Sequence, residues 1–263
     1  MSEKRLAVGP TLSRSRKIRV VQLVVVFGLV GFLEFAPKLG WIGRTTLIPL
    51  SAMVGELAGL ISSGEITPHL VRTFGAVLGA FVTATIAGIA TGIVLLQYQS
   101  LNDILEPYLL IYYAIPFFAF YPLLVAIVGL GILPILLIAF GFSVVIIVTN
   151  TASELDEIPE QYVQVGRDLN LTTWQMLRYV YFPAAVPYLF TGLKLGFIYS
   201  LIGTIASEFI LADGGLGWLI SFNYNNFNIE GMYAAMLLAI LLALAVNGIL
   251  SYLENRLYRR VRK

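Results

Sequence analysis

Long apolar stretches recur along almost the whole chain, and they limit what this sequence can fold into more than any other feature. A bilayer core requires about 20 apolar residues in a spanning helix, and lipid accepts only helices or closed barrels. Hydrophobic residues make up 58% of the 263 residues and charged residues 12%, against roughly a quarter charged in soluble domains. The sequence therefore predicts an all-α, polytopic membrane protein that forms a single domain over residues 1–263. The six expected spans are 18–36, 74–96, 107–130, 133–151, 184–211 and 232–253.

Two stretches depart from a simple span. Residues 50–61 carry apolar residues at helical spacing together with Glu56, which predicts a short interfacial helix. The third span, 107–130, contains Pro116 and Pro122. Prolines free backbone carbonyls, and membrane proteins tolerate this where the backbone is buried or lines a cavity. The third span is therefore either part of a translocation site or a plain packing kink.

Positive charge is distributed unevenly between the two sides of the membrane that the expected spans define. Of the 17 Lys and Arg residues, 13 lie in the leading tail 1–19, in the segment between the fourth and fifth spans, or in the C-terminal tail. Only Lys38, Arg44 and Arg72 fall on the opposite side. Because cytoplasmic loops are enriched in Lys and Arg, the sequence predicts that both termini and the segment before the fifth span are cytoplasmic.

That segment, 154–183, cannot sit comfortably in lipid, and it reads as two short helices with an elbow. Asn170 tolerates the left-handed conformation that ends a helix. Thr172 and Gln175 have the spacing of a capping box, and Pro183 is expected to stop the second helix. A two-helix elbow with an exposed aromatic residue can fill a groove on a partner protein. The alternative is a folded loop that merely caps the bundle.

Few groups with chemical reactivity lie within the spans. Lys194 and Glu208 are functional candidates because intramembrane charges are costly. They are 14 residues apart, about 21 Å along a helix, and each lies near a span end from which it could snorkel.

The absence of Cys and the single His69 predict no metal cluster. Small residues at 75–79 and 88–92 predict close helix packing.

Other functions are disfavoured by what the sequence lacks. A net charge of +2 does not indicate the strongly basic surface that is typical of nucleic-acid-binding proteins. A Gly-x-x-x-x-Gly-Lys-Ser/Thr phosphate loop is missing, so the chain does not supply an ATPase of its own. HExxH, Gly-x-Ser-x-Gly and a paired intramembrane Asp are also missing, which argues against an intramembrane enzyme.

The elbow resembles the cytoplasmic EAA loop of ATP-binding-cassette importer permeases. In that pattern a Gly follows a Glu-Ala-Ala, and a Pro follows 13 residues after the Gly. Alignment from Pro183 puts the Gly at Asn170 and the Glu-Ala-Ala at residues 164–166, where this chain has Gln-Val-Gly. The departures leave the elbow geometry intact, because Asn also adopts the left-handed conformation, but they put a salt-bridge role of the Glu in doubt.

Further motifs resemble the nitrate/sulfonate/taurine-type subclass of these permeases, and the resemblance covers residues 33–255. Ile115-Pro116-x-x-Ala119-x-x-Pro122-Leu123 is similar to its third-span signature, and a Gly-Leu-Gly follows at 129–131. Residues 183–187 and 192–195 resemble its fifth-span entry. Glu208 and the Gly-Leu-Gly at 215–217 fall where the subclass has the same residues.

The resemblance implies a transport subunit of an importer in a bacterial inner membrane, with a core bundle at 74–255 and a coupling loop at 154–183. Its implied partners are a second copy of the permease, ATPase subunits that carry the ATP and Mg, an extracytoplasmic solute-binding protein and the lipid bilayer. The chain itself is expected to bind no cofactor, metal or nucleic acid. The coupling residues implied are Arg167, Asp168, Leu169, Asn170, Leu171, Thr172 and Trp174. The pathway candidates are Tyr112, Tyr113, Pro116, Phe117, Phe118, Tyr121, Lys194 and Glu208.

The substrate and one rival class stay open at this point. The subclass handles small anions such as sulfonates, taurine and nitrate, and also thiamine-precursor pyrimidines and riboflavin. Aromatic pathway candidates would suit a flat ring, although aromatic residues are also ordinary span residues. The rival is an ion-coupled secondary transporter that uses Lys194 and Glu208. Against it, the chain has no inverted repeat and few spans for that class.

Overall fold

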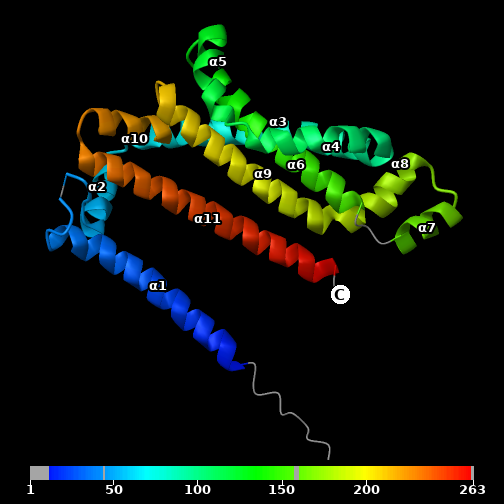
Figure 1. Ribbon diagram of the computed structural model, residues 1–263, viewed down its shortest axis with the longest axis horizontal. Helices are drawn as coiled ribbons and strands as arrows, with labels where there is room; N and C mark the ends of the chain where they lie inside the picture. Colours follow the sequence, from blue (N-terminus) through cyan, green and yellow to red (C-terminus); the bar gives the residue numbers. More distant parts are fainter. Residues whose placement is uncertain (1–11, 44, 157–159, 262–263) are drawn as a thin grey trace, which may run out of the picture.

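A computed structural model describes residues 12–43, 45–156 and 160–261, and these residues form helices and short connections without a β-strand. Figure 1 shows α2 and α10 at one end of the long axis and α7 and α8 at the other. Five segments are long and apolar enough to cross a membrane, in α1, α3, α6, α9 with α10, and α11. The helices are α1 (Leu12–Lys38), α2 (Leu50–Ser62), α3 (Thr67–Gln97), α4 (Gln99–Ala114), the 3₁₀ turn η1 (Phe117–Phe120), α5 (Tyr121–Val128), α6 (Ile132–Asp156), α7 (Glu160–Asp168), α8 (Thr173–Met176), the π-helical turn η2 (Leu177–Tyr181), α9 (Phe182–Leu211), α10 (Leu216–Asn225) and α11 (Ile229–Val261).

The expected third span, 107–130, is not a single helix. α4 ends at Ala114, and Ile115 has an extended backbone with φ −80° and ψ 123°. Pro116 explains this break, since a proline disfavours helical geometry in the residue before it. Pro122 lies in the first turn of α5, where a missing N–H costs little. α5 then stands away from the direction of the neighbouring helices (Figure 1), so the chain passes this region in two shorter helices rather than one.

The centre of the bundle is α6, which packs between α3 and α9. Small residues bring these helices together. A Cβ on Gly88 of α3 would lie 2.7 Å from Ile147 of α6, and one on Gly196 of α9 would lie 2.6 Å from the same side chain. Close packing at 88–92 is therefore confirmed. At 75–79 only Gly79 has a close neighbour, because Gly75 faces open space.

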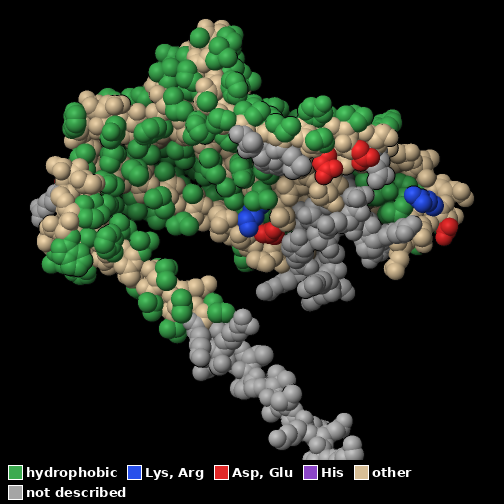
Figure 2. Space-filling view, in the orientation of Figure 1, with side chains coloured by type: hydrophobic (Ala, Val, Ile, Leu, Met, Phe, Trp, Pro, Cys, Tyr) green, Lys and Arg blue, Asp and Glu red, His purple; other side chains and the backbone are tan. Residues whose placement is uncertain are grey.

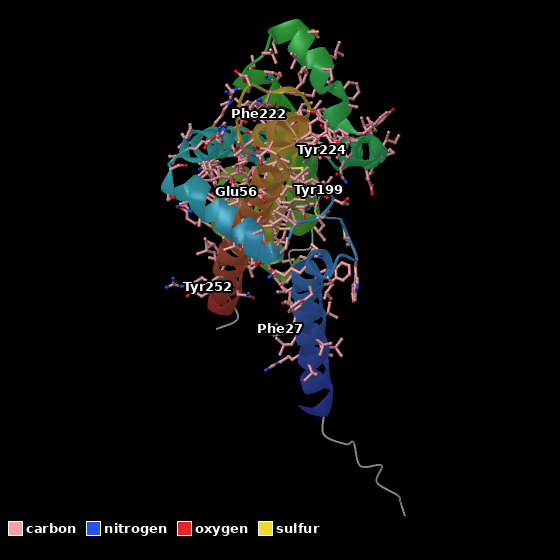
Figure 3. All side chains as sticks on the ribbon, turned by 90° about the vertical axis from the view of Figure 1, so that its left-hand side faces the viewer. Phe27, Glu56, Tyr199, Phe222, Tyr224 and Tyr252 are labelled. Atoms are coloured by element: carbon pink, nitrogen blue, oxygen red, sulfur yellow. The ribbon has the colours of Figure 1, made fainter. Side chains whose placement is uncertain are left out.

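α1 lies largely apart from the other helices. Its apolar window is 11% buried, and Phe27 projects from a part of α1 that no other helix covers (Figure 3). α1 is held at its C-terminal end, where Glu34 forms an ion pair with Lys38 and accepts hydrogen bonds from the Ser51 N–H and Oγ, both at 2.8 Å. These contacts join α1 to the first turn of α2, which packs on α11.

Candidate coupling loop and translocation residues

The turn between α7 and α8 ends the first helix of the elbow, here defined as residues 160–181. Asn170 has φ +50°, which confirms the left-handed prediction. Its N–H donates to the Arg167 carbonyl at 2.8 Å, and the Leu171 N–H donates to the Gly166 carbonyl at 3.1 Å. This pair of bonds is a Schellman motif, which satisfies carbonyls that a helix end leaves free. The direction of the chain after α7 is therefore set by local hydrogen bonds.

The second helix of the elbow starts with the expected capping box. The Thr172 N–H donates to Gln175 Oε1 at 2.8 Å, and the Gln175 N–H donates to Thr172 Oγ1 at 3.4 Å. The two helices then pack together at Gly166, where an added Cβ would overlap the sulfur of Met176 and lie 3.2 Å from Val180. The elbow is thus a packed helical hairpin.

Pro183 does not stop the second helix, so that prediction is wrong. Residues 173–211 are helical without interruption, through α8, η2 and α9. The turn immediately before Pro183, Leu177–Tyr181, is π-helical. A π-turn inserts an extra residue into the helix, and it lies directly before the position where the missing N–H of a proline would otherwise interrupt the hydrogen-bond ladder. The outer helix of the elbow is therefore continuous with a membrane span. The start of the expected loop 154–183 also differs from the prediction, because α6 continues through residue 156.

The turn of the elbow presents apolar side chains to the outside. Leu169 is 67% exposed and Trp174 is 74% exposed. Arg167, Asp168 and Thr172 are exposed around them, while Leu171 is half-buried. Figure 2 shows that hydrophobic side chains dominate the face on view and that its charged side chains lie toward the elbow half. An exposed indole flanked by charges has the composition of a protein docking surface.

The break in the third span gathers part of the predicted pathway set. The Tyr112 hydroxyl donates to the Gly141 carbonyl of α6 at 2.9 Å, and its ring lies 4.9 Å from that of Phe117. Phe117 covers Gly141, where a Cβ would overlap its ring. Phe142 of α6 meets both neighbouring rings: Phe117 approaches it edge-on with ring centroids 6.2 Å apart, and Phe118 stacks on it with an interplanar angle of 11°. Aromatic rings therefore line the break next to Pro116.

The two other aromatic candidates are placed differently. Tyr121 is fully buried and belongs to a core cluster with Ala76, Ile135 and Ile138, against which Phe117 and Phe142 pack. Tyr113 is in α4, but its side chain lies outside the described part of the chain.

The two intramembrane charges on α9 have separate partners. Lys194 Nζ lies 3.0 Å from Glu254 Oε2 of α11, and Thr191 Oγ1 donates to the other oxygen of Glu254 at 2.8 Å. Glu208, near the other end of α9, is fully buried. Lys194 is therefore paired with α11, and the partners of Glu208 lie around the start of α10.

Glu208 belongs to a cluster that caps the N-terminus of α10. The Gly217 N–H donates to Glu208 Oε2 at 3.0 Å, and Thr73 of α3 donates its hydroxyl to the same carboxylate at 2.9 Å. Thr73 Oγ1 also accepts the Leu216 N–H at 2.8 Å, and His69 Nδ1 accepts the Gly215 N–H at 3.2 Å. Side chains from α3 and α9 thus satisfy three consecutive donors of a helix start.

The α10 cap, defined as His69, Thr73, Glu208 and residues 213–217, also explains the Gly-Leu-Gly motif. Gly215 has φ +106°, and a Cβ there would overlap the Glu208 carboxylate. A Cβ on Gly217 would lie 2.7 Å from the Cβ of Glu208. Asp213 adds an ion pair with Arg72 of α3, so a salt bridge as well as hydrogen bonds ties this turn to the core helices.

Sequence reasoning missed the partners in both clusters. Glu254 lies one residue beyond the predicted end of the sixth span, yet antiparallel spans bring it to the depth of Lys194. A search for opposite charges at the same membrane depth on different spans would have identified Glu254 as the partner of Lys194. His69 and Thr73 are one helical turn apart, and that spacing places both on the same face of α3.

With the geometry in place, comparison with known proteins decides the family. Residues 84–263 match the family described as "Binding-protein-dependent transport system inner membrane component". The chain belongs to this family of transport permeases. Membership makes it a subunit of an ABC importer, in which a separate ATPase hydrolyses ATP, and it goes against the secondary-transporter alternative.

Individual relatives support the same assignment. The permease is 30% identical over 214 residues to the riboflavin transport system permease protein RibX of Chloroflexus aurantiacus, covering 81% of this chain and 80% of the relative. It is 30% identical over 175 residues to the nitrate import permease protein NrtB of Synechocystis sp., covering 66% and 64%. An inward-facing structure of the MetNI methionine ABC transporter matches with a TM-score of 0.65, 18% identity and coverage of 73% and 95%, which supports the fold.

Proposed function

We propose that two copies of this permease form the pathway of an importer, with the elbow docked on the ATPase and the α10 end facing the extracytoplasmic binding protein. The observation that carries the proposal is the elbow itself, a hairpin that presents Leu169 and Trp174 and continues into α9. ATP and Mg are held by the ATPase subunits and not by this chain.

The proposed topology has six membrane crossings, with residues 107–130 as the third crossing in two pieces. The excess of Lys and Arg at the elbow and in both tails supports a cytoplasmic location for all three. A soluble ATPase can then reach the elbow from the cytoplasm. Polar turns at the α10 end would face the opposite compartment.

Coupling in this scheme follows from helix continuity. Closure of the ATPase dimer on ATP binding moves the elbow, and the uninterrupted helix 173–211 carries that movement along α9. α9 packs on α6 and α3, so the three core helices respond together and the pathway changes between inward- and outward-facing states. The Lys194–Glu254 pair extends the response to α11.

The proposed solute is a small anion or a flat heterocycle, as the names of the relatives indicate for those proteins. The aromatic break favours the heterocycle. Tyr112, Phe117 and Phe118 surround a point where Pro116 opens the backbone, and ring faces stack well on flat conjugated molecules. Phe118 is 42% exposed in the single chain, so its ring is accessible.

Co-purification tests the proposal directly. The permease is expressed with the ATPase encoded beside it, and the complex is assayed for elution as one species and for ATP hydrolysis. Trp174→Ala is expected to lose the ATPase subunit, because a large exposed aromatic side chain at the centre of a docking surface typically contributes strongly to binding. Trp41→Ala is the matched control, since Trp41 is 73% exposed and follows α1 at the α2 end of the molecule, opposite the elbow (Figure 1).

Two outcomes would contradict the proposal. In the first, Trp174→Ala and Trp41→Ala retain the ATPase equally well, which would remove the elbow as the dock. In the second, the wild-type permease purifies without any ATPase, and uptake depends on an ion gradient instead of ATP.

A further inference from the structure

The connection between α10 and α11 contains an unusual backbone conformation. Phe227 has φ +56°, and Asn170 is the other non-glycine residue with a positive φ in the described part of the chain. Asn tolerates this region through its short polar side chain, whereas Phe has no such compensation. Conformations of this kind persist where the surroundings impose them, and they concentrate at functional sites.

A network of amides holds Phe227 in this conformation. The Phe227 N–H donates to the Tyr224 carbonyl at 3.1 Å. On its other side, Asn228 donates its side-chain amide to Asn223 Oδ1 at 2.8 Å, and Asn228 Oδ1 accepts the Gly231 N–H at 3.1 Å. The backbone around Phe227 is therefore fixed on both sides, while its ring is 87% exposed, the highest value among the exposed large hydrophobic side chains described.

An open pocket of about 640 Å³ adjoins this ring. Its lining includes Lys38, Thr45, Ser51, Phe227, Asn228 and Glu230. The pocket thus joins the connection after α1 to the start of α11, and the Tyr233 hydroxyl bonds the same two regions through the Thr46 carbonyl at 2.5 Å. The rest of the lining is apolar and includes Ile48, Pro49 and Ile229. A lining that mixes both charge signs with apolar side chains suits the surface of a protein, which presents the same mixture.

The surrounding surface has the composition of an interface. Tyr224 is 59% exposed and Phe222 is 47% exposed, and both lie at the α10 end that faces the viewer in Figure 3. Exposed asparagines separate these aromatic residues from Phe227. Protein interfaces combine aromatic anchors with a polar rim, and a rigid anchor loses little conformational entropy on binding.

We propose that Phe227 and the adjoining pocket form the docking site for the extracytoplasmic solute-binding protein. This inference rests on the proposed function, which places the α10 end outside the cytoplasm, and it adds the residues that make the contact. The family description supplies the partner, because transport in this family depends on a binding protein. Phe227 enters a cleft on the binding protein, and the pocket receives a side chain from it.

The left-handed backbone makes a clean test possible. Phe227→Gly removes the ring and places at this position the residue that accepts φ +56° most readily, so the loop keeps its conformation. The permease–ATPase complex is reconstituted in nanodiscs and titrated with the purified solute-binding protein encoded in the same gene cluster. We expect Phe227→Gly to raise the Kd at least tenfold without lowering the unfolding temperature. Glu230→Lys should also change the Kd and its salt dependence.

Trp41→Ala is the control, because Trp41 is exposed at the same end and does not line the pocket. It should leave the Kd unchanged. A Kd for Phe227→Gly within twofold of wild type overturns the inference. So does a result in which Phe227→Gly changes only thermal stability in lipid, because the ring would then be a membrane anchor. Failure of the wild-type complex to hydrolyse ATP would instead contradict the proposed function.

Discussion

Two buried threonines, one in the α10 cap and one on α9, are expected to respond with opposite sign to the same substitution. Thr73 and Thr204 are both fully buried. The Thr73 hydroxyl bonds Leu216 and Glu208, whereas Thr204 Oγ1 has no hydrogen-bond partner among the described residues. Replacement by Val is nearly isosteric in each case, so the difference between the two variants isolates the hydroxyl.

The expected magnitudes follow from these contacts. Thr73→Val leaves the Leu216 N–H unpaired and removes one donor from a buried carboxylate, and each unsatisfied buried group costs roughly 1–3 kcal/mol. We therefore expect a loss of about 3 kcal/mol in the free energy of unfolding. Thr204→Val removes a hydroxyl that is buried without compensation, and we expect a gain of about 1 kcal/mol.

Unfolding of the purified permease in detergent measures both values. Trp218 stacks on His69 with ring centroids 5.1 Å apart, so its fluorescence reports on the cap once Trp41 and Trp174 are replaced by Phe. Thr73→Ser keeps the hydroxyl and should recover most of the loss. If Thr73→Val and Thr204→Val shift stability in the same direction by similar amounts, the hydrogen bonds assigned to the cap do not hold α10 in place.

Two further predictions concern the helix contacts of the bundle. In a double-mutant cycle of Lys194→Met and Glu254→Gln, unfolding measurements should give a coupling of about 1 kcal/mol, and a coupling near zero would show that α9 and α11 are held by apolar packing alone. Gly88→Leu should destabilise the fold by about 3 kcal/mol, because the side chain must enter the space of Ile147. Gly75→Leu is its control in the same helix and should change stability by less than about 0.5 kcal/mol, so equal losses from the two glycine variants would contradict the packing described for α3.

Local features of the elbow could be predicted from sequence because short-range hydrogen bonds determine them. The left-handed Asn170 and the Thr172–Gln175 box each depend on residues within four positions. The prediction that Pro183 ends the second helix is wrong for the complementary reason. Whether a proline ends a helix depends on the turn before it, and a π-helical turn has no clear mark in the residues 177–181 themselves.

Long-range features were only partly accessible. Pro116 indicated a break in the third span, but the direction of α5 after the break depends on packing against α6. Lys194 and Glu208 stood out as intramembrane charges, whereas their partners lie on other helices, 60 residues away for Glu254 and 135 for Thr73. The sequence alone therefore identified the costly groups and not the contacts that stabilise them.

The α10 cap also has a consequence for the order in which the chain matures. Its donors at residues 215 and 216 follow their acceptors on α3 by 146 and 143 residues. During synthesis, α3 therefore enters the bilayer long before the turn that it must hold exists. The turn can close only after α9 has inserted and met α3, so α10 is among the last parts to settle. Protection of this turn from protease in pulse-labelled cells would accordingly mark the moment when bundle assembly is complete.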